Sequence, residues 1–211
     1  MTITYRIQFF EYWQSSSGLS AGTQAALRVR KTHTGLPMIP GRGLKGLLNE
    51  AGYKIQSLQK QYDYEKELIS EDFLKAIFGL GDNEYNDTNI ETDAGKSKET
   101  TCFFTNAELS QQLSQELSQP ERRGQIPLLY QTLSFTKIAA NGLADDKTLR
   151  TVEATVPLTL YAQIRDFPTT PGYVEQLAYC MQWIRRMGLN RTRGMGRCAF
   201  SIIDPKISTN D

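Results

Sequence analysis

Apolar residues recur every two positions in some segments of this chain and about every 3.6 positions in others. This succession of strand-like and helix-like repeats constrains the fold most strongly. Residues 3–13 alternate, with Ile3, Tyr5 and Ile7 on one face, which predicts a half-buried β-strand. Apolar side chains three and four positions apart predict helices at 43–52, 64–78 and 171–187. Alternating or β-branched stretches predict strands at 102–109, 126–138, 152–164 and 198–203. The order strand, helix, strands, helix, strand predicts an α+β fold of the ferredoxin-like (RRM-like) sandwich type, with insertions between its elements.

Two segments interrupt this order within what we expect to be one domain, 1–211. Residues 81–101 are acidic, rich in Asn, Asp and Thr and nearly without apolar anchors, so we expect a mobile surface insertion there. Residues 110–124 repeat a Leu-Ser-Gln pattern that fits either a polar helix or a loop. Together with the apolar patches at 126–138 and the turn Asn141-Gly142, they predict a thumb-like β excursion from about 110 to 150.

Composition excludes several classes of protein. The hydrophobic content is 39% and the mean hydropathy −0.44, which fits a protein in solution with a substantial core. No run approaches the ~18 apolar residues that a membrane span needs, and the N-terminus lacks a secretory pattern. The three cysteines are scattered and form no CxxC pair, so we expect no disulfide framework, no metal site and a cytoplasmic location. We expect no cofactor and no membrane partner.

Two glycine-rich basic segments stand out against a formal net charge of only +1. The first segment, residues 37–48, reads PMIPGRGLKGLL, and the second segment, residues 187–197, reads MGLNRTRGMGR. No Asp or Glu lies between Glu11 and Glu50 or between Glu175 and Asp204. Glycines beside cations let a polyanion approach the backbone amides, so these segments predict a phosphate-binding surface.

The first segment also satisfies G-x-G-x-x-G, from Gly41 to Gly46. A dinucleotide site requires an apolar strand directly before this motif, whereas Pro37 and Pro40 occupy that position. We therefore favour an RNA-phosphate loop over a dinucleotide site, with a plain helix-entry turn as the remaining alternative.

Residues 34–46, TGLPMIPGRGLKG, resemble the signature loop of the CRISPR-associated RAMP superfamily. The likeness is greatest to the backbone subunits of type III effector complexes, in which a TG-P-IPGSSLKG pattern enters the first helix. Phe78-Gly79 is similar to the Phe-Gly pair that follows the second helix in these subunits. Thr136-Lys137-Ile138 is similar to their thumb, and residues 191–197 are similar to their C-terminal glycine-rich loop. These matches occur in the family's order and cover most of the chain outside the acidic insertion.

The resemblance implies a structural subunit of a type III CRISPR ribonucleoprotein effector in antiviral defense. Such a subunit binds the guide RNA, stacks on copies or paralogous backbone subunits beside a large polymerase-like subunit, and displaces bases of the guide–target RNA pairing with its thumb. The RNA-binding residues expected on this basis are Arg28, Arg30, Lys31, Gly41, Arg42, Gly43, Lys45, Arg191, Arg193, Gly194, Gly196 and Arg197. The thumb residues expected to displace bases are Leu128, Leu129, Tyr130, Thr136 and Ile138.

The chain departs from the target-cleaving members of this family at one position. Those members carry an aspartate in the loop before the signature, and the matching positions here are Gln24, Ala25, Ala26 and Leu27. Cleavage of this kind needs a carboxylate to hold a metal or to accept a proton. We therefore expect a subunit without its own target-RNA cleavage site.

Two alternatives stay open. One is a RAMP-type endoribonuclease that processes precursor guide RNA, with His33, the single histidine, as a metal-free general base. The other is an RRM-like module unrelated to CRISPR. The second alternative is disfavoured because the stretches 101–104 and 198–201 lack the basic-aromatic strand motif of RRM proteins.

Overall fold

A four-stranded antiparallel sheet organises the protein, in a computed structural model that describes residues 1–16, 28–79, 100, 102–136, 142–143 and 148–204. The strands are β1 (Ile3–Phe9), β2 (Phe103–Phe104), β5 (Thr159–Arg165) and β6 (Cys198–Asp204), in the order β2–β5–β1–β6. In β1, Tyr5 lies opposite Ala162 on one side and Ile202 on the other. This order is that of a ferredoxin-like fold, which confirms the fold class expected from the sequence.

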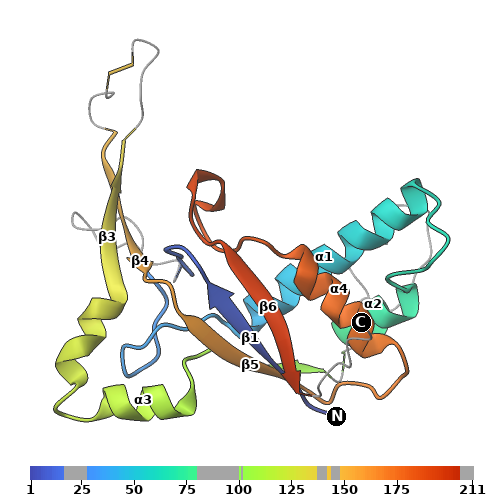
Figure 1. The fold of residues 1–211 in the computed structure, drawn as a ribbon, viewed down its shortest axis with the longest axis horizontal. Helices are drawn as coiled ribbons and strands as arrows, with labels where there is room; N and C mark the ends of the chain where they lie inside the picture. The colour runs from blue at the N-terminus through green and yellow to red at the C-terminus, as the bar shows by residue number, and fades with distance from the viewer. Residues whose placement is uncertain (17–27, 80–99, 101, 137–141, 144–147, 205–211) are drawn as a thin grey trace, which may run out of the picture.

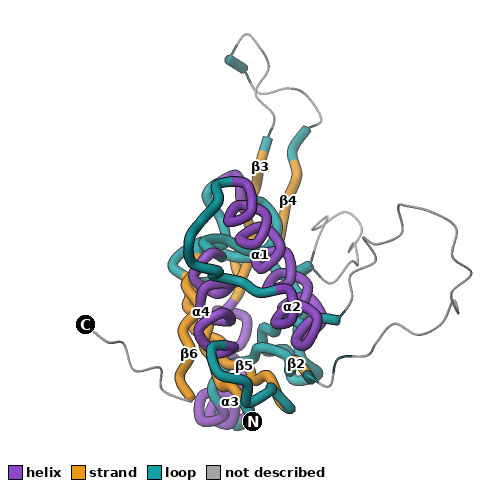
Figure 2. Tube along the Cα trace, turned by 90° about the vertical axis from the view of Figure 1, so that its right-hand side faces the viewer, coloured by secondary structure: helices purple, strands orange, loops and turns teal. Residues whose placement is uncertain are grey.

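Helices cover one face of this sheet, as Figures 1 and 2 show. They are α1 (Gly41–Gln61), α4 (Tyr173–Trp183) and the shorter α2 (Glu71–Phe78). The residues of β1 that face them, Ile3, Tyr5, Ile7 and Phe9, are buried. Arg6 on β1 and Tyr161 on β5 alternate with these residues and are exposed on the opposite, open face.

A second, two-stranded sheet projects from the body as a hairpin (Figure 1). It pairs β3 (Tyr130–Phe135) with β4 (Arg150–Thr155), and α3 (Gln111–Ser118) and the 3₁₀ helix η2 (Arg123–Leu129) precede it. Trp13 joins it to the body, because Trp13 and Thr155 exchange backbone hydrogen bonds of 3.1 and 2.8 Å. The expected excursion is therefore part helix and part hairpin. Residues 137–141 and 144–147 lie outside the described residues, as does the predicted acidic insertion apart from Thr100.

The helix boundaries expected from the sequence were wrong in three places. α1 continues past Gly52, because this glycine is an interior packing position: a Cβ there would lie 2.6 Å from the Leu74 side chain. α2 starts at Glu71 rather than at 64, because Ser70 caps it and Gln59 holds the preceding backbone as a loop. α4 ends at Trp183, because Met187 pairs instead with Gly196 of the second segment.

Several strand predictions also needed correction. The strand expected at 3–13 ends at Phe9, and the strand expected at 102–109 is limited to Phe103–Phe104. Residues 152–164 do not form one strand, because the chain crosses from β4 to β5 at 156–158, where Pro157 has no N–H for a ladder. Residues 126–129 belong to η2, so the predicted strand at 126–138 begins only at Tyr130. None of the helices in the described part of the chain combines the length and apolarity that a bilayer crossing requires.

Candidate nucleic-acid interface

The first glycine-rich segment is held in place by the edge of the main sheet. Pro40 precedes the first turn of α1 in an extended conformation, and Gly41 N–H donates to Asn106 Oδ1 at 3.0 Å. A Cβ on Gly41 would lie 2.0 Å from the carbonyl oxygen of Phe104. Gly41 is therefore buried against the protein's own backbone, whereas Arg42 and Gly43 are exposed.

The second glycine-rich segment is folded back on the end of β1. Gly188, Gly194 and Gly196 have positive φ angles of 89°, 82° and 72°, which glycine adopts without strain. Leu189 N–H donates to the Gln14 carbonyl at 3.1 Å, and Gly196 N–H donates to the Tyr12 carbonyl at 2.8 Å. A Cβ on Gly188 would lie 2.4 Å from the Gln14 carbonyl oxygen, so this contact requires glycine.

These contacts bring the two segments together around one groove of about 600 Å³. Arg42 and Gly43 of the first segment face it, as do Gly188 and Leu189 of the second. Arg30 contributes from a third stretch, whose backbone is tied to Ser15 and Met38 by hydrogen bonds of 2.7 and 3.3 Å. The complete lining is Gln14, Ser15, Ser16, Arg30, Ile39, Pro40, Arg42, Gly43, Leu47, Met187, Gly188 and Leu189. Two arginines, polar side chains and glycines in one open groove suit a phosphate backbone.

Several residues expected to bind RNA lie outside this groove. Lys45 is half-buried on another side of α1, about 200° around the helix from Leu47. Its Nζ lies 3.2 Å from Thr100 Oγ1. Arg197 lies over the ring of Phe10, with 5.6 Å from guanidinium carbon to ring centroid. Arg193 and Gly194 are exposed at the short 3₁₀ helix η3 (Arg191–Arg193), and Arg28 is exposed beside the buried Val29. Gly196 is buried, where a Cβ would lie 2.0 Å from the Met187 carbonyl oxygen.

A second hollow, of about 200 Å³, adjoins the groove through the shared residue Leu47. We call it the Trp183 pocket; its other lining residues are Glu50, Ala51, Lys54, Trp183, Ile184, Arg185, Arg186 and Arg191. The hydrogen bond from Lys54, at 2.5 Å, lowers the pKa of Glu50, and Arg191 lowers it further. Trp183 is not among the residues expected from the sequence to bind RNA. The sequence does indicate that its side chain is exposed, because Trp183 lies outside the apolar stripe formed by Val174, Leu177, Ala178, Met181 and Ile184.

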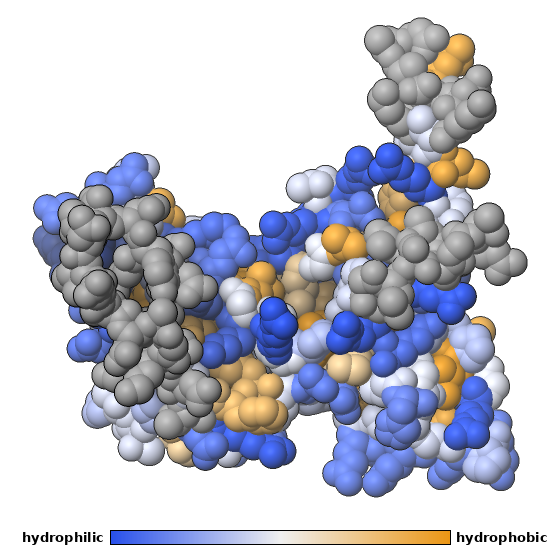
Figure 3. Space-filling view, turned by 180° about the vertical axis from the view of Figure 1, so that it is seen from behind, coloured by the Kyte–Doolittle hydropathy of each residue, from blue (hydrophilic) through white to orange (hydrophobic). Residues whose placement is uncertain are grey.

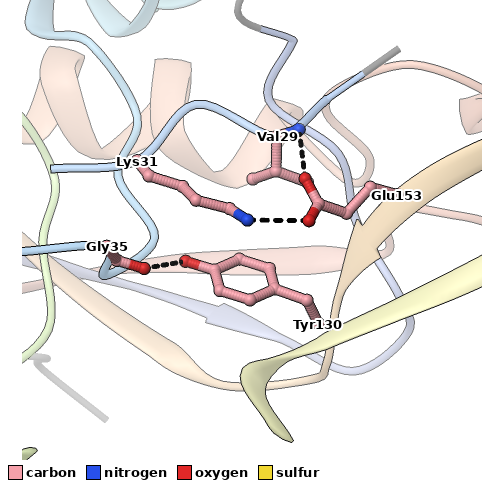
Figure 4. Close-up of polar contacts among 5 residues, drawn as sticks. All are labelled: Val29, Lys31, Gly35, Tyr130 and Glu153. Atoms are coloured by element: carbon pink, nitrogen blue, oxygen red, sulfur yellow. Dashed lines mark hydrogen bonds and ion pairs between the residues drawn. The ribbon is translucent and has the colours of Figure 1, made fainter. Parts of the chain in front are cut away.

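The base of the hairpin holds Lys31 and Tyr130 in contacts within the protein (Figure 4). Glu153 on β4 accepts from Lys31 Nζ at 2.7 Å and from Val29 N–H at 3.0 Å. Lys31 Nζ also lies 3.8 Å from the centre of the Tyr130 ring, and the Tyr130 hydroxyl donates to the Gly35 carbonyl at 2.6 Å. Burial raises the pKa of Tyr130, and the carboxylate of Glu153 adds to this shift. Lys31 and Tyr130 therefore fasten the hairpin to residues 28–36, which we call the basic loop.

The other expected thumb residues differ in their surroundings. Leu128 is 74% exposed at the end of η2, whereas Leu129 packs against the core. The hydroxyls of Thr136 and Thr148 lie 3.0 Å apart, and Ile138 falls outside the described residues. Seen from behind (Figure 3), the hairpin stands apart from the body, with hydrophilic and apolar side chains on the surface between them.

His33 lies in a different hollow, of about 670 Å³, between the basic loop and α3. Its neighbours there include Asn106, Glu108, Gln111 and Gln115, and no residue is shared with the groove. Among the described residues, no three His, Cys, Asp or Glu side chains gather in a way that would hold a metal ion. The positions matched to the family's aspartate, Gln24 to Leu27, lie outside the described residues.

Comparisons with known proteins identify the fold but no sequence relative. No protein-family model matches the chain, and no curated protein matches it. A structure of the type III-B Cmr-beta complex bound to cognate target RNA contains a chain with a TM-score of 0.62 and 10% identity, covering 96% of this chain and 97% of that one. A chain of the same complex in its apo state matches with a TM-score of 0.60 and 12% identity, covering 98% of this chain and 99% of that one. A chain of a type IV-B CRISPR complex matches with a TM-score of 0.63 and 13% identity, covering 98% of this chain and 92% of that one.

The protein therefore has the fold of chains found in CRISPR complexes, over nearly its whole length. The resemblance expected from the signature segments is confirmed at the level of the fold.

Proposed function

We propose that this chain is a guide-RNA-binding structural subunit of a type III CRISPR effector ribonucleoprotein in antiviral defense. The observation that carries the proposal is the groove that both glycine-rich segments line, with Arg30 and Arg42 on its walls. The fold neighbours support it, since one of them belongs to a complex bound to target RNA. Guide RNA, target RNA, paralogous backbone subunits and a large polymerase-like subunit are the partners that follow from this role.

The groove suits a single strand held by its backbone. Arginines and exposed backbone contact phosphates irrespective of base, so the binding has little sequence preference and depends strongly on salt. Leu128 is exposed before β3 and Thr136 follows its last residue; on the proposed function these two residues meet bases rather than phosphates.

The direct test replaces Arg30 and Arg42, the two arginines of the groove, with alanine and measures the affinity for a single-stranded RNA over a range of salt concentrations. Each lost phosphate contact lowers the slope of log K against log[salt] by about 0.7, so the double variant should lose about 1.4. The matched control is Arg6→Ala with Arg165→Ala, which removes the same charge from the open face of the sheet. An unchanged slope in the groove variant, or an equal loss in the control, contradicts the proposal.

We also propose that the subunit does not cut RNA. Incubation with guide–target duplex and with repeat RNA, with and without magnesium, should leave both intact. Repeat-RNA cleavage that disappears in His33→Ala would instead support the endoribonuclease alternative. The separation of the His33 hollow from the groove argues against that alternative.

A further inference from the structure

The two tryptophans of this chain have opposite environments. Trp13 is 1% exposed, stacks on Phe9 with 4.3 Å between ring centroids, and donates its indole N–H to the Val156 carbonyl at 3.1 Å. Trp183, the last residue of α4, is 46% exposed. The core accounts for Trp13, whereas Trp183 presents a large aromatic surface to solvent.

The surroundings of Trp183 are strongly cationic. Lys54, Arg185, Arg186 and Arg191 line the same pocket with one carboxylate, Glu50, so the four positive and one negative charges leave a formal charge of +3. Glu50 is already paired with Lys54. An aromatic side chain ringed by cations suits a ligand that combines a planar ring with a phosphate.

The pocket and the groove share a wall residue. Leu47 lines both hollows, and Arg191 follows Leu189 of the groove by two residues. The pocket has a third of the groove's volume, about 200 against 600 Å³, so it suits contact with a single base and its phosphate rather than with a length of strand.

We propose that Trp183 stacks on one base of a single-stranded RNA whose backbone the groove holds, while Arg191 and Arg185 bind the adjacent phosphate. This inference rests on the proposed function and adds a base-contacting subsite to it. Every base has a π face, so the subsite is tolerant of sequence. A protein partner would meet the same arginines, but the four cations and the wall residue Leu47 shared with the groove favour RNA.

Tryptophan fluorescence tests the proposal directly in the full chain. Stacking of a base on Trp183 should quench its emission when oligouridylate or oligoadenylate is added, whereas emission from the buried Trp13 stays constant. The variant Trp183→Phe retains only Trp13 and should show no quenching. Inorganic polyphosphate, a polyanion without bases, should bind without quenching.

Affinity measurements complete the test. Trp183→Ala should weaken oligonucleotide binding by about 5- to 150-fold and leave polyphosphate binding unchanged. Trp183→Phe should retain most of the RNA affinity, because its ring still stacks. Near-ultraviolet circular dichroism and thermal unfolding establish that both variants are folded.

The outcomes separate this inference from the proposed function. If RNA binding depends on salt but the fluorescence is not quenched and Trp183→Ala keeps its RNA affinity, the stacking role is overturned while the proposed binding of RNA in the groove stands. Absence of binding by RNA and polyphosphate alike overturns both. A change in Trp183 emission that follows protein concentration instead of added RNA makes the pocket a protein interface and overturns the inference.

Discussion

Glycines in the two basic segments serve two different purposes that sequence alone does not separate. Gly41, Gly188 and Gly196 let the protein's own backbone pass within a distance that excludes a Cβ. Gly43 and Gly46 have no heavy atom within 4 Å of the place where a Cβ would lie. Of these two, only Gly43 lines the groove, so its missing side chain leaves room for a ligand.

Gly43→Ala should therefore separate stability from binding. The substitution should raise the free energy of unfolding by up to about 1 kcal/mol, because alanine favours a helix, and should weaken RNA binding by filling the groove. Gly46→Ala is the matched control, with the same helical gain outside the groove. Denaturant unfolding and RNA titration measure the two effects. Equal RNA affinity in both variants would show that Gly43 does not face the ligand.

Gly41→Ala should instead destabilise the fold. A Cβ at 2.0 Å from the Phe104 carbonyl forces α1 away from β2 and disturbs the bond between Gly41 N–H and Asn106. We expect a loss of at least about 2 kcal/mol in denaturant unfolding. A loss below about 0.5 kcal/mol would mean that the helix start shifts without strain.

The buried thiols give a test of the core. Burial raises the pKa of Cys180 and of Cys198 to about 12, and it also raises the pKa of Cys102. The thiol form is unreactive, so the native protein at pH 8 should resist a thiol reagent that labels all three cysteines after unfolding. The unfolded chain loses these protons from about pH 9, so stability should fall as the pH rises from 9 toward 12. Rapid labelling of Cys180 in the native protein would contradict the burial of its thiol, which projects from α4 toward Gly52 of α1.

At the scale of elements, the hairpin has fewer strand pairings than the main sheet, because within the described residues β3 pairs only with β4. Its attachments to the body include the Trp13–Thr155 bridge, Glu153, which holds both Val29 and Lys31, and the Tyr130 hydroxyl, which donates to Gly35. The basic loop and the hairpin are therefore coupled through the Glu153 carboxylate and the Tyr130 hydroxyl.

Glu153→Gln should remove the charge and keep an acceptor for Val29 N–H. Since Lys31 and Glu153 are both partly exposed, we expect a loss of about 0.5 to 1 kcal/mol that diminishes at high salt. Glu153→Ala also removes the acceptor and should cost about 1 kcal/mol more. Urea unfolding at low and high salt distinguishes the two, and equal losses in both variants would mean that the Val29 bond contributes nothing.

Periodicity predicted the elements of the central sheet well and their boundaries less well. The alternation in residues 3–13 and the helical spacing around Leu44 and Leu48 are local properties, so β1 and α1 could be expected. The end of α1 could not, because Gly52 is retained for contact with Leu74, which only the tertiary fold brings near. The intramolecular role of Lys31 was hidden for the same reason, since its partner Glu153 is 122 residues away.

At the scale of the whole molecule, β1 is the central organising strand. It is hydrogen-bonded along both edges, to β5 and to β6, and its inner face is buried under the helices. In the described part of the hairpin, β3 and β4 form a single ladder with each other, and the buried side chains, Val152, Ala154 and Thr155, all belong to β4. Local stability should therefore fall from the central sheet toward the projecting strands.

Amide hydrogen exchange should reveal this gradient. We expect the slowest exchange in β1 and β5 and clearly faster exchange in β3, whose side chains are exposed or half-buried. Bound RNA should add protection at Arg30 and at residues 187–189, which line the groove, and none in Arg6 or Tyr161. Uniform protection across both sheets would contradict the assignment of the hairpin as a separate, weaker unit.

The docking of residues 187–197 on Tyr12 and Gln14 also bears on the order of events during translation. The ribosome makes Tyr12 and Gln14 early, whereas the segment that completes the groove emerges more than 170 residues later. Until then, Arg30 and Arg42 line only part of the groove. The complete groove can therefore form only after residues 187–189 have been synthesised.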